Sequence, residues 1–405
     1  MTTMNRAMKP FTALVSAEDA LELMLSKSRP VTGVETVALE DADGRVVAEE
    51  IKSTINVPAF DRAAMDGYAV NSLDLEEPGL LKEAGGAYAG SPYGKALKRG
   101  ECVEIATGAP IPKGADAVVM VEQSTKVGSA VSFTQPIQPG ENIGLKAADI
   151  AKGDTVVARG MRLTPGTIAA VAIVGKAKVK VFKRPEVLVF TTGDEVQAPG
   201  VRLGAGQVYD SNSFAMMAIA KRAGANVTYR PNVQDSHASL KRAIAASAKK
   251  YDLIVFSGGT SVGSRDFARD VLDELGRVHV HGIAIKPGKP VLYANVENCG
   301  VFGMPGNPTS CLLTARLFLA PTIRKLAHWD EEEAPGLPVT LGHEVKQDKT
   351  KQLLVPVALD EQVVAVSTFK SSSSITSLSA SVGYLEIEPG DGVIPKGTEM
   401  PMRVI

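Results

Sequence analysis

Three loops in the second half of the chain carry residue types that hold anionic ligands. The first is Thr191-Thr192-Gly193-Asp194-Glu195, which directly follows the apolar run VLVF. Its hydroxyls and its glycine allow a ligand to approach the backbone closely, and its two carboxylates offer oxygen ligands to a hard cation such as Mg²⁺. The same residues could instead form a polar turn that caps the next element. The residue types alone leave both interpretations open.

The second loop is rich in glycine and hydroxyl side chains. It runs SGGTSVGSRD over residues 257–266 and lies between an apolar run and a predicted helix. The backbone N–H groups of such a loop can cradle a phosphate at the start of a helix. The spacing is neither that of a P-loop nor that of a dinucleotide-binding fingerprint. Its position after a buried run favours phosphate binding over a purely structural glycine loop.

The third loop combines two lysines with a second proline-rich turn. Lys286 and Lys289 stand in IKPGKP, where the prolines reduce the entropy lost when the lysines become ordered. Two ammonium groups in one rigid turn suit an oxyanion or a pyrophosphate, although a lysine pair is more often solvated surface. In the turn MPGNP, we expect Asn307 to be the N-cap and Pro308 the first residue of a helix. The free N–H groups of that helix should face the same rim as the lysines.

A fourth segment, PAFDRAAMDGYAV at residues 58–70, sets three charged residues among large apolar ones. The residue types favour a structural turn with Asp66-Gly67 at its tip. They also predict that Phe60, Met65 and Tyr68 are buried. A functional role for Asp66 is the alternative.

The surrounding elements must position these loops. Residues 16–27 predict a helix with Ser16 as its N-cap, and residues 30–180 predict a β-rich region with many turns. From residue 184 strand patterns alternate with helix patterns, which predicts a parallel α/β sheet. Because ligands bind beyond the carboxyl ends of such strands, the three loops should meet at one edge. Residues 338–405 return to β patterning and predict a small barrel or sandwich.

Composition argues against several classes of protein. The formal net charge of the 405 residues is -1, so no overall field attracts nucleic acid or an anionic membrane. Cys102, Cys299 and Cys311 are scattered, which fits a reducing compartment and argues against disulfides or a thiolate zinc site. The N-terminus lacks the apolar core of a signal peptide, and no apolar segment approaches the roughly 20 residues that span a bilayer. We therefore expect a cytoplasmic protein that binds neither nucleic acid nor a membrane.

Taken in order, the motifs resemble those of the bacterial molybdopterin molybdenumtransferases, relatives of the gephyrin E domain and the plant molybdenum-insertion domain. The matching stretches are VPAFDRAAMDGYAV, IATGAPIP, TGDE, YDSN, SGGTSVGSRDF, AIKPGKP and GMPGNP. The resemblance runs from residue 12 to the end. It implies molybdenum cofactor biosynthesis, in which adenylyl-molybdopterin and molybdate react in the presence of Mg²⁺ to give the cofactor and AMP. It also implies a homodimer, with a molybdopterin adenylyltransferase as the upstream partner.

The resemblance further implies a multidomain fold of the α/β plus β class. A β-rich connector would dimerise, a mobile domain would close on the cleft, a central parallel α/β domain would bind the pterin, and a β-barrel would end the chain. The implied bounds are, in that order, residues 33–52 with 153–183, residues 53–152, residues 12–32 with 184–327, and residues 328–405. The residue patterns by themselves separate only three regions: a β-rich N-terminal half, an α/β region and a C-terminal β region.

Roles for single residues follow from the same resemblance. The implied catalytic residues, of which the first two come from the opposing domain, are Asp66, Thr107, Lys286, Lys289 and Asp266. The implied cofactor-binding residues are Thr192, Gly193, Gly258, Gly259, Ser261, Asp235, Pro305, Gly306, Asn307, Pro308 and Ser372, with Ser377 as the alternative to Ser372. Asp194 and Glu195 would hold Mg²⁺ or the pterin phosphates.

One stretch departs from the family pattern. Where relatives carry several arginines before Gly-Glu-Asp, this chain has IGLKAAD at residues 143–149, with Lys146 as its only basic residue. This change weakens the expectation that the loop binds an anion. Three alternative functions remain: adenylylation of molybdopterin with ATP, handling of tungstate by a paralogue, and a non-catalytic scaffold. ATP consumption in the absence of molybdate would favour the first.

Overall fold

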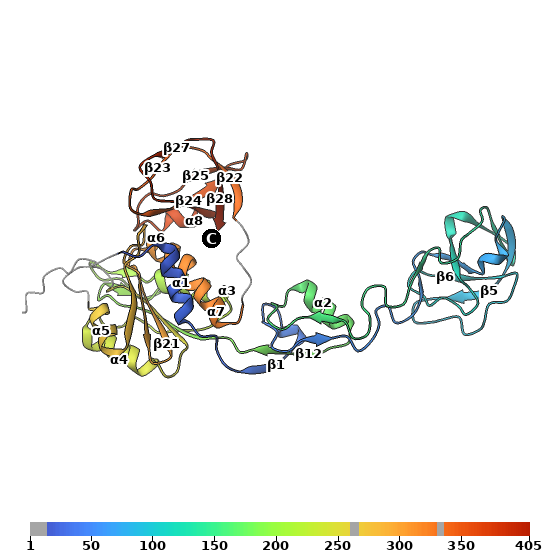
Figure 1. The fold of residues 1–405 in the computed structure, drawn as a ribbon, viewed down its shortest axis with the longest axis horizontal. Helices are drawn as coiled ribbons and strands as arrows, with labels where there is room; N and C mark the ends of the chain where they lie inside the picture. Colours follow the sequence, from blue (N-terminus) through green and yellow to red (C-terminus); the bar gives the residue numbers. More distant parts are fainter. Residues whose placement is uncertain (1–13, 260–266, 330–335) are drawn as a thin grey trace, which may run out of the picture. The chain divides into compact units, whose positions relative to one another are not determined.

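The computed structural model describes residues 14–259, 267–329 and 336–405 (Figure 1). The chain forms two compact units. The smaller comprises residues 36–43 and 47–180, and the larger comprises the described parts of residues 1–35, 44–46 and 181–405. The smaller unit is therefore largely an insertion in the sequence of the larger one.

A six-stranded sheet forms the centre of the larger unit. Its strands, in spatial order, are β16 (Asn226–Tyr229), β13 (Glu186–Thr191), β17 (Leu253–Ser257), β21 (Cys299–Met304), β20 (Leu292–Val296) and β18 (Arg277–His281). The first four strands are parallel, which confirms the predicted α/β sheet. The last two strands differ, because β20 is antiparallel to β21 and β18 is antiparallel to β20. This antiparallel pairing was not predicted. Only Glu297 and Asn298 join β20 to β21, and so short a link can connect only antiparallel strands.

Helices cover both faces of this sheet, because successive strand residues point to opposite sides. Val187 and Val189 of β13 pack on one face, and Leu188 and Phe190 pack on the other. The first face carries α1 (Ala17–Lys27), α3 (Asn212–Arg222), α6 (Pro308–Thr314), a π-helical turn (Ala315–Leu319) and α7 (Ala320–Leu326). The second face carries α4 (His237–Ser247) and α5 (Ala268–Leu275). Ser16 caps α1 as predicted, since its Oγ accepts a bond from the Asp19 N–H.

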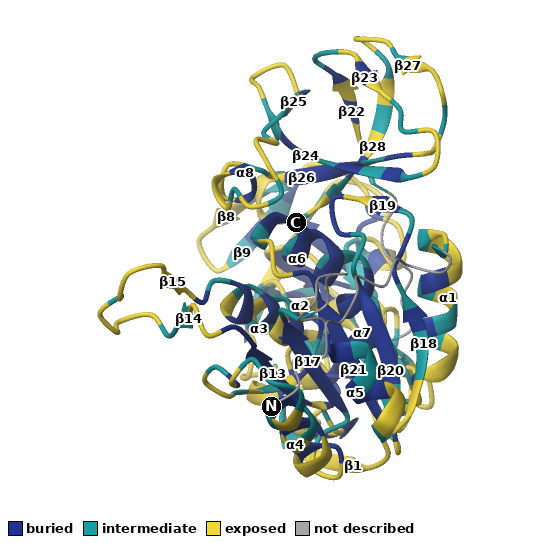
Figure 2. Cartoon of the chain, turned by 90° about the vertical axis from the view of Figure 1, so that its left-hand side faces the viewer, coloured by how far each residue is buried: buried dark blue, intermediate teal, exposed yellow. Residues whose placement is uncertain are grey.

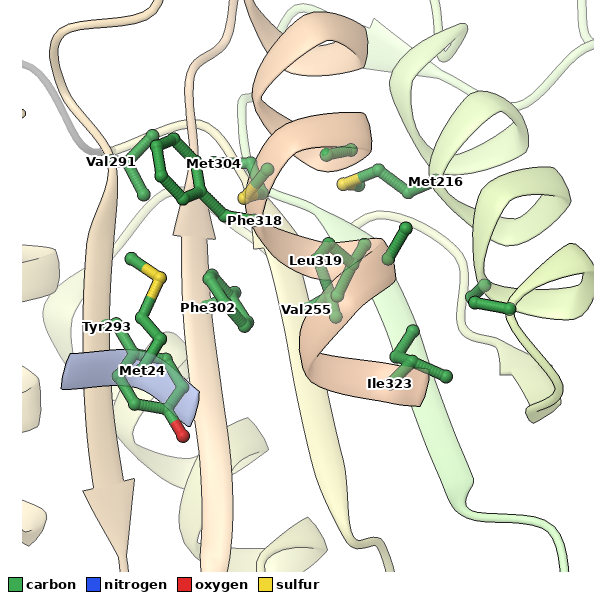
Figure 3. Close-up of a cluster of buried hydrophobic side chains, with 14 of the residues drawn as sticks. Met24, Met216, Val255, Val291, Tyr293, Phe302, Met304, Phe318, Leu319 and Ile323 are labelled. Carbon is green, nitrogen blue, oxygen red and sulfur yellow. The ribbon is translucent and has the colours of Figure 1, made fainter. Parts of the chain in front are cut away.

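The core on the first face combines residues of the helices with residues of the strands. Figure 3 shows Met24 of α1, Met216 of α3 and Phe318 of the π-helical turn around the strand residues Val255 and Phe302. Figure 2 shows the central strands as the buried layer between helices whose outer sides are exposed.

All three cysteines are buried and free of disulfides, and burial raises the pKa of each thiol to about 12.

A closed five-stranded barrel ends the chain. Its strands are β22 (Leu337–Leu341), β24 (Gln352–Leu359), β25 (Val364–Ser367), β26 (Gly383–Ile387) and β28 (Glu399–Val404). The ring closes because β24 pairs with both β25 and β26. The smaller elements of this region are β19 (Ile285–Lys286), which pairs with β24, the pair β23 (Val345–Lys346) and β27 (Val393–Ile394), and α8 (Thr376–Ser379). Of the two predicted alternatives, the barrel is confirmed.

The smaller unit is built on a second six-stranded sheet. Its strands, in spatial order, are β7 (Ala117–Met120), β4 (Gly67–Val70), β6 (Glu101–Ile105), β5 (Gly79–Ala87), β9 (Ala130–Phe133) and β8 (Ser124–Val127). Short pairs are β3 (Arg62–Ala63) with β10 (Ile143–Gly144), β2 (Ile51–Lys52) with β11 (Thr155–Val157), and β1 (Val34–Ala38) with β12 (Lys178–Phe182). The helix α2 (Pro165–Ile173), capped by Thr164, was not predicted.

Over the described ranges, no helix has the length and apolar character needed to cross a bilayer.

Candidate functional site

A pocket of about 300 Å³ lies at the carboxyl ends of the parallel strands. It is lined by Thr191, Thr192, Glu195, Val196, Val208, Tyr209, Asp210, Ser211, Asn212, Ser257, Gly258, Gly306, Pro308 and Ser373. The lining therefore draws on TTGDE, YDSN, SGG, PGNP and the serine run near residue 372. This edge is where parallel sheets bind ligands, and the volume is at the lower end of the roughly 300–1,000 Å³ of small-molecule sites.

A buried hydrogen-bond network ties three of these loops together. The Asn212 side-chain amide donates to the Ser257 Oγ and to the Gly306 carbonyl, each at 2.8 Å. The Ser257 hydroxyl in turn donates to the Pro305 carbonyl at 3.0 Å. Sequence reasoning did not select Asn212 or Ser257 as site residues, although the YDSN stretch contains Asn212. The network fixes the PGNP turn relative to the ends of β17 and α3.

Asp210 is a second buried residue that sequence reasoning did not select. Its carboxylate accepts bonds from the Thr191 hydroxyl at 3.0 Å, the Ser213 backbone N–H at 2.9 Å and the Tyr229 hydroxyl at 3.4 Å. Burial, and then the Asp210 charge, raises the pKa of Tyr229. Asp210 therefore joins the end of β13 to the start of α3 on the polar side of the pocket.

The glycine loop after β17 comes very close to the loop after β13. A Cβ at Gly258 would lie 2.5 Å from the Thr192 carbonyl oxygen, and its φ of +101° also favours glycine. The Thr192 hydroxyl is buried and has no hydrogen-bond partner among the described residues. Because a buried polar atom normally has a partner, this hydroxyl is available to a ligand in the pocket.

The predicted residues Ser261 and Asp266 lie outside the described residues.

Three predicted carboxylates lie in loops that follow β13 and β16. Asp194 and Glu195 are exposed, and Asp194 accepts a bond from the Asp235 N–H at 3.3 Å. Only Glu195 is part of the pocket lining. Within the described part of the chain, no three or more His, Cys, Asp or Glu residues are grouped to hold a metal ion. Mg²⁺ often needs only one or two carboxylates together with substrate phosphates, so the residues fit that use.

The lysine turn packs against the helix that follows PGNP. A Cβ at Gly288 would lie 2.4 Å from the Thr314 methyl group of α6. Lys286 is exposed, Lys289 is half-buried, and neither lines the pocket. The geometry thus brings the two predicted motifs together without placing the lysines in the pocket lining.

Asn307 is the N-cap residue of α6 and Pro308 its first residue, as predicted. The side chain of Asn307, however, makes no capping bond within the helix. Its amide instead donates to the Ser372 hydroxyl at 3.1 Å, and the Thr309 N–H donates to the Ser372 carbonyl at 3.1 Å. The serine run thus competes for the Asn307 side chain, which sequence alone did not indicate.

Within the serine run, neighbouring residues have different environments. Ser372 lies on the PGNP turn, whereas the adjacent Ser373 is the one that lines the pocket. Ser377 is fully buried, and its hydroxyl accepts the Lys370 N–H at 3.0 Å. Ser377 is therefore a structural residue of the barrel region.

In the smaller unit, Asp66 and Thr107 form a close exposed pair. The Asp66 carboxylate accepts the Thr107 N–H at 2.6 Å and the Thr107 hydroxyl at 2.8 Å. These bonds, the backbone bond first, lower the pKa of Asp66. The expected role of this pair, to complete the site from the opposing domain, stays a prediction.

The structural turn predicted around Asp66 is wrong in two respects. Gly67 is the first residue of β4 and not a turn tip, and a Cβ there would lie 1.9 Å from the Val119 carbonyl oxygen. Phe60 and Met65 are 45% and 46% exposed, whereas Tyr68 is buried as predicted. The segment joins the six-stranded sheet only at Gly67, and Phe60 and Met65 lie outside the core although Ala63 between them is buried.

Comparisons with known proteins agree along the chain. Residues 15–175 match the MoeA N-terminal region (domain I and II), residues 188–325 a probable molybdopterin binding domain, and residues 338–404 the MoeA C-terminal region (domain IV). The molybdopterin molybdenumtransferase of Haemophilus influenzae is 38% identical over 314 residues, covering 77% of this chain and 78% of that protein. The same-named protein of Nostoc sp. is 33% identical over 333 residues, covering 79% and 76%.

Solved structures are similar over nearly the whole chain. The molybdopterin biosynthesis moea protein from Pyrococcus horikosii has a TM-score of 0.80 at 36% identity, covering 97% of this chain and 99% of that one. A second structure, the moeA protein from Pyrococcus horikoshii OT3, has a TM-score of 0.85 at 26% identity, covering 97% and 100%. The sequence resemblance and the fold therefore identify one and the same family.

Proposed function

Because the chain belongs to the molybdopterin molybdenumtransferase family of molybdenum cofactor biosynthesis, we propose that it transfers molybdate to adenylyl-molybdopterin and releases AMP. The observation that carries the proposal is the pocket at the carboxyl edge of the sheet, where TTGDE, YDSN, SGG and PGNP meet. Its polar side offers buried hydroxyl, amide and carboxylate groups, and its mouth offers the carboxylate of Glu195. Such a site suits a flat substrate that carries phosphate groups.

We assign the charged groups around the pocket to the charged parts of the substrates. Molybdate is a dianion, so Lys286 and Lys289 are suited to hold it or the leaving phosphate by charge-assisted hydrogen bonds. Asp194 and Glu195 would hold Mg²⁺, which when bound would neutralise phosphate charge. The chain itself contributes orientation and electrostatic stabilisation, and no covalent intermediate is needed.

The proposal includes the remaining expectations from the family. The active form is a cytoplasmic homodimer, in which Asp66 and Thr107 of the opposing domain complete the site. Asp235, Ser261 and Asp266 contribute to its rim, and the chain divides into four domains with the bounds given above. A molybdopterin adenylyltransferase supplies the substrate.

The test is AMP release from adenylyl-molybdopterin in the presence of Mg²⁺, with and without molybdate. We expect AMP only when molybdate is present, and a rate about 10- to 100-fold lower for Lys289→Ala, because a hydrogen bond to a charged group is lost. Lys250→Ala is the matched control, since Lys250 lies just before the amino end of β17, at the opposite edge of the sheet. It should keep the wild-type rate.

Other outcomes would replace the proposal. ATP consumption with molybdopterin and no molybdate would identify an adenylyltransferase. Folded, dimeric protein that releases no AMP would identify a scaffold. Substituting tungstate for molybdate in the same assay measures the preference between the two oxyanions.

A further inference from the structure

We propose that Tyr209 is the stacking platform for a flat bicyclic nitrogen heterocycle, either the pterin or the adenine ring, in the pocket at the carboxyl edge of the sheet. The choice of these two rings rests on the proposed function. Tyr209 stands at the end of an arm of the chain that joins the TGDE and YDSN stretches. This arm comprises residues 194–210 and contains β14 (Val196–Gln197) and β15 (Val208–Tyr209).

The arm fixes both the backbone and the side-chain hydroxyl of Tyr209. Its two strands pair in parallel, with Gln197 opposite Tyr209, and the Asp210 N–H donates to the Gln197 carbonyl at 2.8 Å. The Tyr209 hydroxyl donates to the Val201 carbonyl at 3.0 Å, so the far end of the ring is fixed to the same arm. Figure 2 shows this arm extending beside α3, mostly exposed. An aromatic ring fixed in this way loses little conformational freedom when it binds a ligand.

Tyr209 is an exposed aromatic residue on the wall of a pocket. Its side chain is 48% exposed, although the residue lines the pocket together with Val196 and Val208 of the same arm. A single exposed apolar residue needs no explanation, but the exposed Val208 and Tyr209 lie on one pocket wall with the half-buried Val196, which points to contact with a ligand. The hydroxyl bond accounts for the polar end of the tyrosine and leaves the role of its ring face open.

The rest of the pocket fits the edge of such a ring. Thr192, Asp210 and Asn212 line it with polar atoms, and the Thr192 hydroxyl has no partner among the described residues. A nitrogen heterocycle has apolar faces and a hydrogen-bonding edge, so it matches a pocket with one apolar and one polar side. Stacking of a heterocyclic base on an aromatic side chain strengthens binding about 10- to 100-fold.

The experiment measures binding of free pterin and of AMP, separately, to the full-length protein by calorimetry. We expect Tyr209→Ala to weaken the binding of at least one ring about 10- to 100-fold. Tyr209→Phe keeps the ring and loses only the bond to Val201, so it should stay within about threefold of wild type. Tyr209→Leu keeps an apolar side chain without the aromatic face and should resemble Tyr209→Ala. Tyr88→Ala, which removes an exposed tyrosine of the other unit, should change neither affinity.

The two rings give distinct results. Loss of pterin binding assigns the pocket to the pterin, and loss of AMP binding assigns it to the adenine. The proposal is overturned if the wild type binds neither ring, or if Tyr209→Ala and Tyr209→Leu retain full affinity for both. The measurement needs no molybdate and no turnover. A wild type that binds a ring through Tyr209 yet releases no AMP would therefore refute the proposed function and leave ring stacking intact.

Discussion

Replacing Asn212 by alanine tests whether the buried network holds the three loops of the pocket together. The change removes both 2.8 Å bonds of the side-chain amide and leaves the Gly306 carbonyl and the Ser257 Oγ each without a donor. A buried group left unsatisfied costs about 1–3 kcal/mol. Gly306 is exposed, so water can replace the donor at its carbonyl, and the cost falls on the buried Ser257 Oγ. Because the Ser257 hydroxyl keeps its bond to the Pro305 carbonyl, we expect the larger unit to lose about 1–3 kcal/mol in its free energy of unfolding.

Urea denaturation followed by tryptophan fluorescence measures this loss. Trp329 is the only tryptophan of the chain and belongs to the larger unit, so its signal reports on that unit alone. With a denaturant slope of roughly 2–3 kcal/mol per molar, the midpoint should fall by about 0.5–1 M. Asn226→Ala is the control, because the Asn226 amide donates to Glu186 at the exposed surface. Its free energy should change by no more than about 0.5 kcal/mol. If Asn212→Ala matched this control, the network would not be what fixes the PGNP turn.

Two further predictions concern the smaller unit. Thr107→Val removes the hydroxyl bond to Asp66 but keeps the backbone bond, so the pKa of Asp66 should rise part of the way toward its usual value in a carbon-detected NMR titration. Because the folded pKa is lowered, the contribution of Asp66 to wild-type stability is present above about pH 4 and is lost as the pH falls through the folded pKa. An unchanged Asp66 titration in Thr107→Val would contradict the role of the hydroxyl bond. Gly67→Ala should cost about 3 kcal/mol or more, because its Cβ would overlap the Val119 carbonyl, and hydrogen exchange at β4 and β7 should accelerate. Gly94→Ala, where a Cβ meets nothing within 4 Å, should leave exchange unchanged.

Local patterns in the sequence predicted most of the elements of the larger unit. The unbroken apolar runs VLVF and LIVF predict strands that are buried on both faces, and Ser16 caps α1 through a bond within its own turn. The rule that ligands bind at the carboxyl ends of parallel strands then correctly placed the loops after β13 and β17 beside one pocket. These features depend on interactions between residues close in sequence, so they can be predicted from the sequence.

Contacts between distant segments were not predictable in this way. The Asn212 amide bonds Gly306, which is 94 residues away, so the pattern YDSN indicated only the polar start of a helix. Asn307 has the residue type of an N-cap, but Ser372, 65 residues later, takes its side chain. Phe60 and Met65 are apolar and yet exposed, because the chain reaches the sheet only at Gly67. In each case the hydrogen-bond partner or the burial of the residue depends on a segment that is distant in the sequence or on the path of the chain.

The insertion of the smaller unit into the sequence of the larger one sets an order of folding during synthesis. The helix α1 ends at Lys27, but it packs against β18, which begins at Arg277, and against α7, which begins at Ala320. At roughly 5–20 residues per second, a ribosome needs on the order of ten seconds to a minute to add the intervening segment. Throughout that interval Ala20 and Met24, which the finished unit buries completely, have no core to enter. The inserted unit, whose residues are contiguous apart from a few, can fold first on the emerging chain, while the core around α1 stays incomplete until the segment after residue 180 has been made.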